Sequence, residues 1–141
     1  MKSGPIILVE DDVDDQEIIM DVLQSLGVKN QILIFENGLK AVDYLKVSEE
    51  QPFLIISDLN LPAMNGLQLR TEIQDNDILR KKSIPFIFFS TSADKKTVTE
   101  AFELSVQGFF VKENTYEGIQ QQLKQIVDYW KNCKHPNSDP A

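Results

Sequence analysis

The sequence predicts an α/β protein in which a doubly wound, five-stranded parallel sheet is covered by helices on both faces. Two observations carry this prediction. Short apolar runs rich in β-branched and aromatic residues recur five times, as is typical of strands that are buried on both faces. Between them lie longer segments in which apolar residues return every three or four positions, as on one face of a helix. This strict alternation implies right-handed crossovers and therefore parallel strands.

Each apolar run is assigned to a strand and each spaced segment to a helix. The expected strands are residues 6–9, 32–35, 53–56, 86–89 and 109–111. The five expected helices contain, in order, Ile18, Ile19, Val22, Leu23 and Leu26; Leu39, Val42 and Leu45; Leu67, Leu69, Arg70 and Ile73; Val98, Ala101 and Phe102; and Ile119, Leu123, Ile126, Val127 and Trp130.

Residues with strong terminal preferences mark the helix limits. Gly27 follows the first expected helix, and Asn37 and Thr115 stand where helix N-caps belong. Asn65 and Gln68 have the spacing of a capping box, which places the start of the third helix.

Length and composition exclude several classes of protein. The 141 residues carry 22 acids against 14 bases, and the net charge of -8 would repel nucleic acid and anionic membrane surfaces. No apolar run is long enough for a signal peptide or a membrane span, and the single cysteine, Cys133, cannot form an internal disulfide. We therefore expect a cytoplasmic protein with one domain over residues 1–130, a frayed polar tail over 131–141 and no effector domain.

Polar side chains follow four of the expected strands at the point where each ends. Glu10 and Asp11 follow the first strand, Asp58 the third, Ser90 the fourth and Lys112 the fifth. In open parallel α/β sheets, sites form outside the carboxyl ends of the strands, so these side chains are expected at one edge of the sheet.

The chemistry of this group points to a metal and a phosphoryl group. Clustered carboxylates repel one another and need a cation, and oxygen ligands without histidine or cysteine suit Mg²⁺. Lys112 would supply a charge for a phosphoryl group, and Ser90 would supply a hydroxyl donor. The carboxylate of Asp58 could then act as nucleophile on phosphorus and form an acyl phosphate.

Three further acids, Asp12, Asp14 and Asp15, continue the acidic run after the first strand. We assign them to capping the first helix and compensating its dipole. On this interpretation Asp15 affects stability alone.

Four motifs stand in the order and at the spacing of one known family. They are ILVEDD, IISDLNLPAMNG, PFIFFSTS and GFFVK. With these motifs the chain, from residue 6 to residue 130, resembles the receiver domains of two-component response regulators. Among these, it resembles the single-domain chemotaxis and phytochrome-associated regulators. The resemblance implies a flavodoxin-like (βα)5 fold with strand order 2-1-3-4-5.

The resemblance also assigns roles. Asp58 would accept a phosphoryl group from the phosphohistidine of a sensor histidine kinase or phosphotransfer protein, assisted by Ser90 and Lys112. The Mg²⁺ ligands would be Glu10, Asp11, Asp58 and the backbone carbonyl of Asn60. Phe109 would be the switch residue, Pro62 and Gly66 would shape the loop after the acceptor, and Asn60 and Ser92 would tune dephosphorylation. The output would be a changed surface on the fourth expected helix, the last strand and the last helix, to which an unidentified protein binds.

The chain departs from the family pattern at three places. Glu113 follows Lys112 where the family usually has proline after a cis bond, so we expect a trans bond here. Phe109 lacks the hydroxyl of the common tyrosine. The stretch 75–83 is longer than in the shortest receivers, and resembles that of phytochrome-associated regulators.

Other functions compete with the phosphoacceptor switch, which we do not expect to be an enzyme. A Mg²⁺-dependent aspartyl-phosphate phosphohydrolase would need a second acid two residues after Asp58, where Asn60 stands. A nucleotide or flavin binder would need a phosphate-binding loop after the first strand, where Glu10 and Asp11 stand. A degenerate receiver that binds partners without phosphorylation stays open, as does the oligomeric state.

Overall fold

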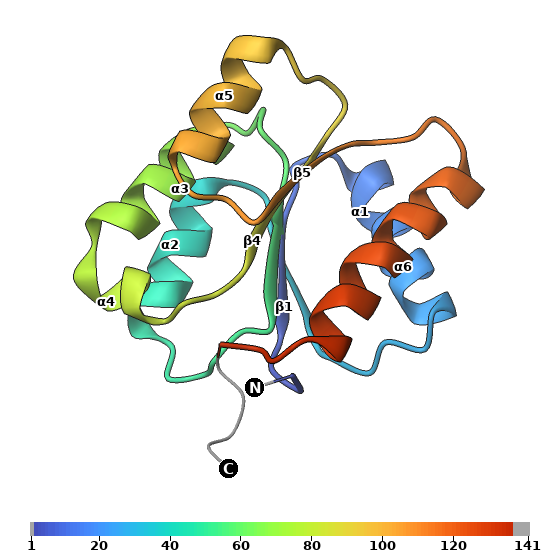
Figure 1. Ribbon diagram of the computed structural model, residues 1–141, viewed down its shortest axis with the longest axis horizontal. Helices are drawn as coiled ribbons and strands as arrows, with labels where there is room; N and C mark the ends of the chain where they lie inside the picture. The colour runs from blue at the N-terminus through green and yellow to red at the C-terminus, as the bar shows by residue number, and fades with distance from the viewer. Residues whose placement is uncertain (1, 137–141) are drawn as a thin grey trace.

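A computed structural model, which describes residues 2–136, contains one five-stranded parallel sheet with the strand order β2-β1-β3-β4-β5 (Figure 1). The α/β class, the parallel pairing and the strand order are therefore confirmed. The strands are β1 (Ile6–Val9), β2 (Ile32–Phe35), β3 (Leu54–Ser57), β4 (Phe86–Ser90) and β5 (Gly108–Val111). The helices are α1 (Val13–Ser25), α2 (Gly38–Val47), α3 (Gly66–Asp75), α4 (Asp77–Lys81), α5 (Lys95–Glu103) and α6 (Tyr116–Asn132).

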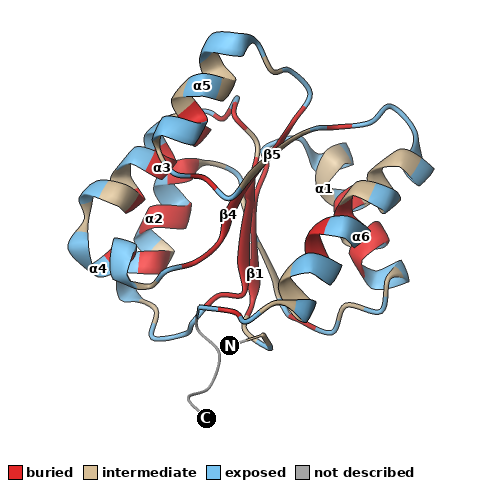
Figure 2. Cartoon of the chain, in the orientation of Figure 1, coloured by how far each residue is buried: buried red, intermediate tan, exposed pale blue. Residues whose placement is uncertain are grey.

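The sheet lies between two layers of helices, with α1 and α6 on one face and α2, α3 and α5 on the other (Figure 1). The side chains of β1 alternate between the layers: Ile6 and Leu8 pack with α1 and α6, whereas Ile7 and Val9 pack with α2 and α3. The central strands are buried along their whole length (Figure 2). Their continuous apolar sequence follows from this two-sided burial.

The strand register brings the carboxyl ends of the strands to one level. Val9 pairs with Ser57 across β1 and β3, and Ser90 pairs with Val111 across β4 and β5. The residues that follow these pairs, Glu10, Asp58 and Lys112, therefore leave the sheet together. The amide of Asp58 still donates to the carbonyl of Val9 at 2.9 Å, which fixes Asp58 to the end of β1.

The helix limits agree with the terminal residues. Asn37 and Thr115 cap α2 and α6, each accepting from a backbone amide. Asn65 and Gln68 form the predicted capping box at the start of α3. Gly27, just after α1, has a φ of 75°, a left-handed conformation that favours glycine.

The prediction of five helices was wrong, because the described chain has a sixth. The stretch 75–83 contains the short helix α4, which Asn76 caps by accepting from the amide of Leu79 at 3.1 Å. Leu79 is buried in the same core cluster as α2 and α3. A single turn with one buried apolar residue has too little periodicity to be seen in the sequence.

The prediction of a frayed tail from residue 131 was also wrong for residues 131–136. The helix α6 runs on to Asn132, and Lys131 donates to the carbonyl of Lys2 at 2.9 Å. His135 is buried, its Nε2 donates to the carbonyl of Phe53 at 2.7 Å, and its ring packs on the Phe53 ring. Residues 137–141 of the predicted tail lie outside the described residues.

Within the part of the chain that the structure describes, no helix combines the length and the apolar character that a membrane crossing needs.

Burial of His135 predicts a pH-dependent contribution to stability. Burial lowers the pKa of His135, the hydrogen bond to the Phe53 carbonyl opposes this shift, and the positive charges of Lys2 and Lys131 add to it. The unfolded chain therefore binds a proton on His135 more readily than the folded chain does. The stability that His135 contributes is full at pH values above the ordinary pKa of histidine, and it is lost as the pH falls through the lowered pKa of the folded chain. We expect His135→Gln to reduce the free energy of unfolding by about 1 kcal/mol at pH 7.5 and by less at pH 5.

Urea denaturation of both chains across this range measures the difference. His135 is the only histidine in the sequence, so no other imidazole contributes. A difference that stayed constant with pH would contradict the assignment.

Candidate functional site

Three carboxylates meet at the carboxyl edge of the sheet. Glu10 and Asp11 directly follow β1, and Asp58 directly follows β3. Each offers an oxygen, and these oxygens all lie within 4.8 Å of one another. Glu10 is buried, Asp58 is half-buried and Asp11 is exposed, so the group opens from the core to the solvent. The structure thus brings together the three acids that the sequence placed at separate strand ends.

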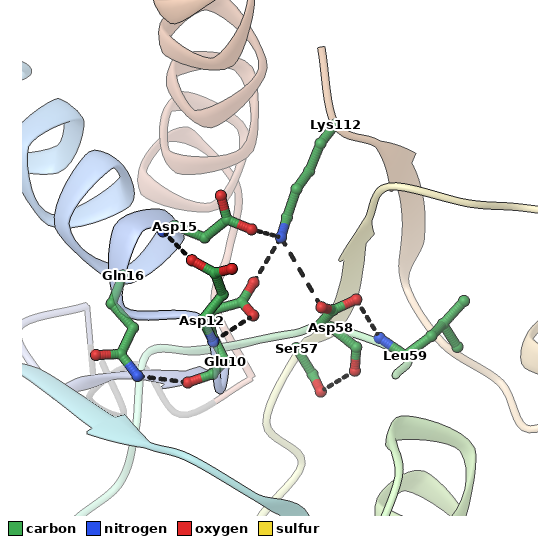
Figure 3. A network of polar contacts seen from close by, with 8 residues as sticks. All are labelled: Glu10, Asp12, Asp15, Gln16, Ser57, Asp58, Leu59 and Lys112. Carbon is green, nitrogen blue, oxygen red and sulfur yellow. Dashed lines mark hydrogen bonds and ion pairs between the residues drawn. The ribbon is translucent and has the colours of Figure 1, made fainter. Parts of the chain in front are cut away.

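The carboxylate of Asp58 is held in one orientation by its own loop. Its Oδ1 accepts from the amide of Leu59 at 2.7 Å, while Ser57 Oγ donates to the Asp58 carbonyl at 2.8 Å. Its other oxygen, Oδ2, lies 4.0 Å from Lys112 Nζ (Figure 3). Asp58 therefore presents Oδ2 toward the cationic side of the site.

Lys112 is the buried cation of the site. Its Nζ donates to Glu10 Oε1 at 2.5 Å and to Asp15 Oδ2 at 3.1 Å (Figure 3). Its amide donates to the carbonyl of Ser90 at 2.8 Å, which continues the β4–β5 pairing and aims the side chain inward. The bond from Lys112 to Glu113 is trans, as expected.

Burial and charge shift the pKa values of Glu10 and Lys112 in opposite directions. Burial raises the pKa of Glu10 to about 7, although the hydrogen bond and charge of Lys112 oppose the rise. Burial lowers the pKa of Lys112, but the hydrogen bond to Glu10 and the charges of Glu10 and Asp58 outweigh it and raise this pKa. Lys112 therefore stays protonated, and the acids depend on it for neutralisation.

Ser90 has a polar atom that the described residues leave unpaired. Its side chain lies at the end of β4, beside the strand that carries Asp58, and is fully buried. Its Oγ is one of two buried side-chain oxygens or nitrogens without a hydrogen-bond partner in residues 2–136. A buried hydroxyl without a partner loses its hydrogen bonds to water, and a ligand oxygen at the site would compensate for this loss.

The three acids after Asp11 make different contacts, a difference that the sequence did not predict. Asp12 is the N-cap of α1, and its Oδ1 accepts from the amide of Asp15 at 3.0 Å. Asp14 is an exposed acid of the first turn. Asp15 is an acid of the first turn, as expected, but its carboxylate also contacts Lys112. The sequence did not predict this contact, which arises because Asp15 lies three and four residues before Ile18 and Ile19, on the helix face that turns toward the sheet.

The remaining predicted residues lie around this cluster. Asn60 and Ser92 are exposed and line one cavity of about 150 Å³ together with Asp94. Phe109 packs its ring on Phe88, with the ring centroids 5.6 Å apart.

Gly66 lets the loop after β3 close against the site. Its amide donates to the carbonyl of Leu59 at 2.9 Å. A Cβ built on Gly66 would lie 2.4 Å from the Asp58 carbonyl oxygen and 2.7 Å from the Phe88 ring. The position therefore has no room for a side chain, and the close contact fixes the backbone of Asp58.

Comparisons with known sequences agree with the motifs. Residues 6–124 match the family described as the response regulator receiver domain. The response regulator Rcp1 of Synechocystis sp. is 29% identical over 130 residues, which cover 89% of this chain and 87% of that protein. The chemotaxis protein CheY1 of Helicobacter pylori is 30% identical over 122 residues, which cover 86% of this chain and 95% of that protein.

Solved structures show the same architecture. The phosphorylated cyanobacterial phytochrome response regulator RcpA superposes with a TM-score of 0.86 at 27% identity, covering 94% of this chain and 98% of that one. The Mn²⁺-bound form of response regulator Rcp1 superposes with a TM-score of 0.82 at 28% identity, with the same coverage of 94% and 98%.

Because Gly66 lies so close to the backbone of Asp58, even a methyl side chain at this position should destabilise the fold. We expect Gly66→Ala to lower the free energy of unfolding by about 1–3 kcal/mol, because the methyl group must displace backbone atoms of Asp58. Gly108→Ala is the matched control, since a Cβ there meets nothing nearer than 3.5 Å. Urea denaturation of the two variants compares them, and equal losses would contradict the assigned role of Gly66.

Proposed function

The chain belongs to the response regulator receiver family, and on that premise we propose that Asp58 is the residue that accepts the phosphoryl group. A receiver domain implies a histidine kinase as partner, and we propose that the phosphohistidine of such a kinase, or of a phosphotransfer protein, is the donor. The observation that carries the proposal is the meeting of three carboxylate oxygens within 4.8 Å beside a buried lysine.

The donor set suits a hard divalent cation. Glu10, Asp11 and Asp58 offer oxygen only, which Mg²⁺ and Mn²⁺ prefer. Rcp1, 28% identical to this chain, has been solved in a Mn²⁺-bound form. We propose that these acids and the backbone carbonyl of Asn60 hold Mg²⁺, which would neutralise charge on the phosphoryl oxygens when bound.

The protein groups then have separate tasks. An oxygen of Asp58 attacks phosphorus, the P–N bond to the donor imidazole breaks, and the imidazole nitrogen keeps the electron pair. The ammonium of Lys112 and the unpaired hydroxyl of Ser90 are suited to receive phosphoryl oxygens. Attack by water on the same phosphorus returns the Asp58 carboxylate and inorganic phosphate.

The protein is a phosphoacceptor switch rather than a classical enzyme. The phosphohydrolase alternative needs an acid at Asn60, whose side chain is an amide and is exposed. The acids that follow β1 likewise leave no phosphate-binding loop for a nucleotide.

The output of the switch is proposed to be the surface of α5, β5 and α6. Phe109 of β5 packs on Phe88 of β4, so a change at the end of β4 reaches it through ring contact. Phe102, Val111 and Tyr129 are large apolar side chains that are exposed on these three elements. Such a surface offers contacts to a protein partner.

Replacement of the acceptor tests the proposal directly. We expect the wild-type chain to gain one phosphoryl group on incubation with acetyl phosphate and Mg²⁺, and Asp58→Asn to gain none, because an amide is not a nucleophile toward phosphorus. Intact-protein mass spectrometry measures both, with excess chelator as a control for the metal. Equal modification of the two chains would refute the site, and an unmodified wild-type chain would favour a degenerate receiver.

The unpaired hydroxyl of Ser90 predicts opposite effects on stability and function. We expect Ser90→Ala to raise the free energy of unfolding by about 1 kcal/mol, because it removes a buried oxygen without a partner. The same change should slow phosphorylation about tenfold, since a hydrogen bond to a charged group contributes roughly 1.5 kcal/mol. Ser90→Thr, which keeps the hydroxyl, is the matched control. A loss of both stability and rate in Ser90→Ala would contradict the role given to Oγ.

A further inference from the structure

Asp15 shares the ammonium of Lys112 with the acids of the proposed phosphorylation site. Asp15 Oδ2 lies 3.1 Å from Lys112 Nζ, which is nearer than Asp58 Oδ2 at 4.0 Å. The Lys112 side chain is 5% exposed and that of Asp15 is 35% exposed, so the contact lies at the mouth of the site. Because Asp12 already caps α1, the Asp15 carboxylate is free for this contact.

The contacts of Lys112 lie on two sides. Figure 3 shows Asp15 on the α1 side of the ammonium and Asp58 on the other. Glu10 Oε1, at 2.5 Å, holds the ammonium from the end of β1. The ammonium is therefore drawn toward β1 and α1, and its distance to Asp58 is longer than a hydrogen bond.

We propose that Asp15 is a positioning residue that holds Lys112 away from Asp58 until a phosphoryl group arrives. This inference rests on the proposed function, because it assigns Asp15 an effect on the modification of Asp58. When Lys112 pairs with a phosphoryl oxygen, it gives up its contact with Asp15. Asp15 thus stabilises the unmodified state relative to the phosphorylated one.

The size of the effect follows from the exposure of the pair. Measured ion pairs at partly exposed positions correspond to about a two- to fivefold change in an equilibrium constant. We therefore expect Asp15→Asn to raise the apparent affinity for beryllofluoride, which stands in for the phosphoryl group on Asp58, about two- to fivefold. The measurement is ¹⁹F NMR of bound beryllofluoride on the full chain at saturating Mg²⁺.

Two variants separate positioning from the loss of a negative charge. Asp14→Asn removes the same charge one residue earlier, from an exposed side chain for which no ion pair or hydrogen bond is found within the described residues. We expect it to change the affinity much less than Asp15→Asn does. Asp15→Glu restores a carboxylate that can reach Lys112, and should return the affinity close to that of the wild type. Equal changes in Asp14→Asn and Asp15→Asn would overturn the proposal.

A second measurement needs neither metal nor phosphoryl group. In the metal-free protein, the ¹³Cε order parameter of Lys112 should fall in Asp15→Asn and stay unchanged in Asp14→Asn, because only the first variant removes a contact of the ammonium. An unchanged order parameter in Asp15→Asn would overturn the role of Asp15. Failure of the wild-type chain to bind beryllofluoride or to be phosphorylated would instead overturn the proposed function, and the order parameters would still decide the role of Asp15.

Discussion

The buried ammonium of Lys112 is the interaction on which the candidate site depends. It contacts Glu10 and Asp15 and lies 4.0 Å from Asp58, so one positive charge offsets the repulsion among acids from three parts of the chain. Like charges about 4 Å apart repel by roughly 4 kcal/mol at an effective dielectric of 20. Such a cluster is stable only with a cation at its centre. The same concentration of negative charge suits the cluster to bind a second cation, the proposed metal ion.

The rest of the fold holds these groups in place without taking part in the chemistry. Parallel strands in register bring residues far apart in the sequence to one level, and helices on both faces bury the sheet that carries them. Gly66 allows the loop after β3 to pass within contact of Asp58, and the Leu59 amide fixes one oxygen of its carboxylate. Rigid positioning of a few polar groups is what phosphoryl transfer requires of a protein.

Elements on which many residues agree could be predicted from the sequence, whereas elements that depend on a single contact could not. The strands and the helix caps follow from runs of apolar residues and from residues with strong terminal preferences. The helix α4 depends on one buried leucine, Leu79, and the ordered segment after α6 depends on His135 reaching the carbonyl of Phe53. A contact between residues 82 positions apart leaves no local pattern in the sequence.

The fold class, the family and the set of acids, hydroxyl and lysine at the strand ends can be read from the sequence, because periodicity, motif order and position after a strand are properties of the chain before it folds. The tertiary structure sets how these groups divide their contacts. It separated Asp12, which caps α1, from Asp15, which contacts Lys112, and it left the Ser90 hydroxyl buried without a partner among the described residues. These contacts depend on how α1 packs against the sheet and on the pairing of β5 with β4, and the packing of the whole core sets both.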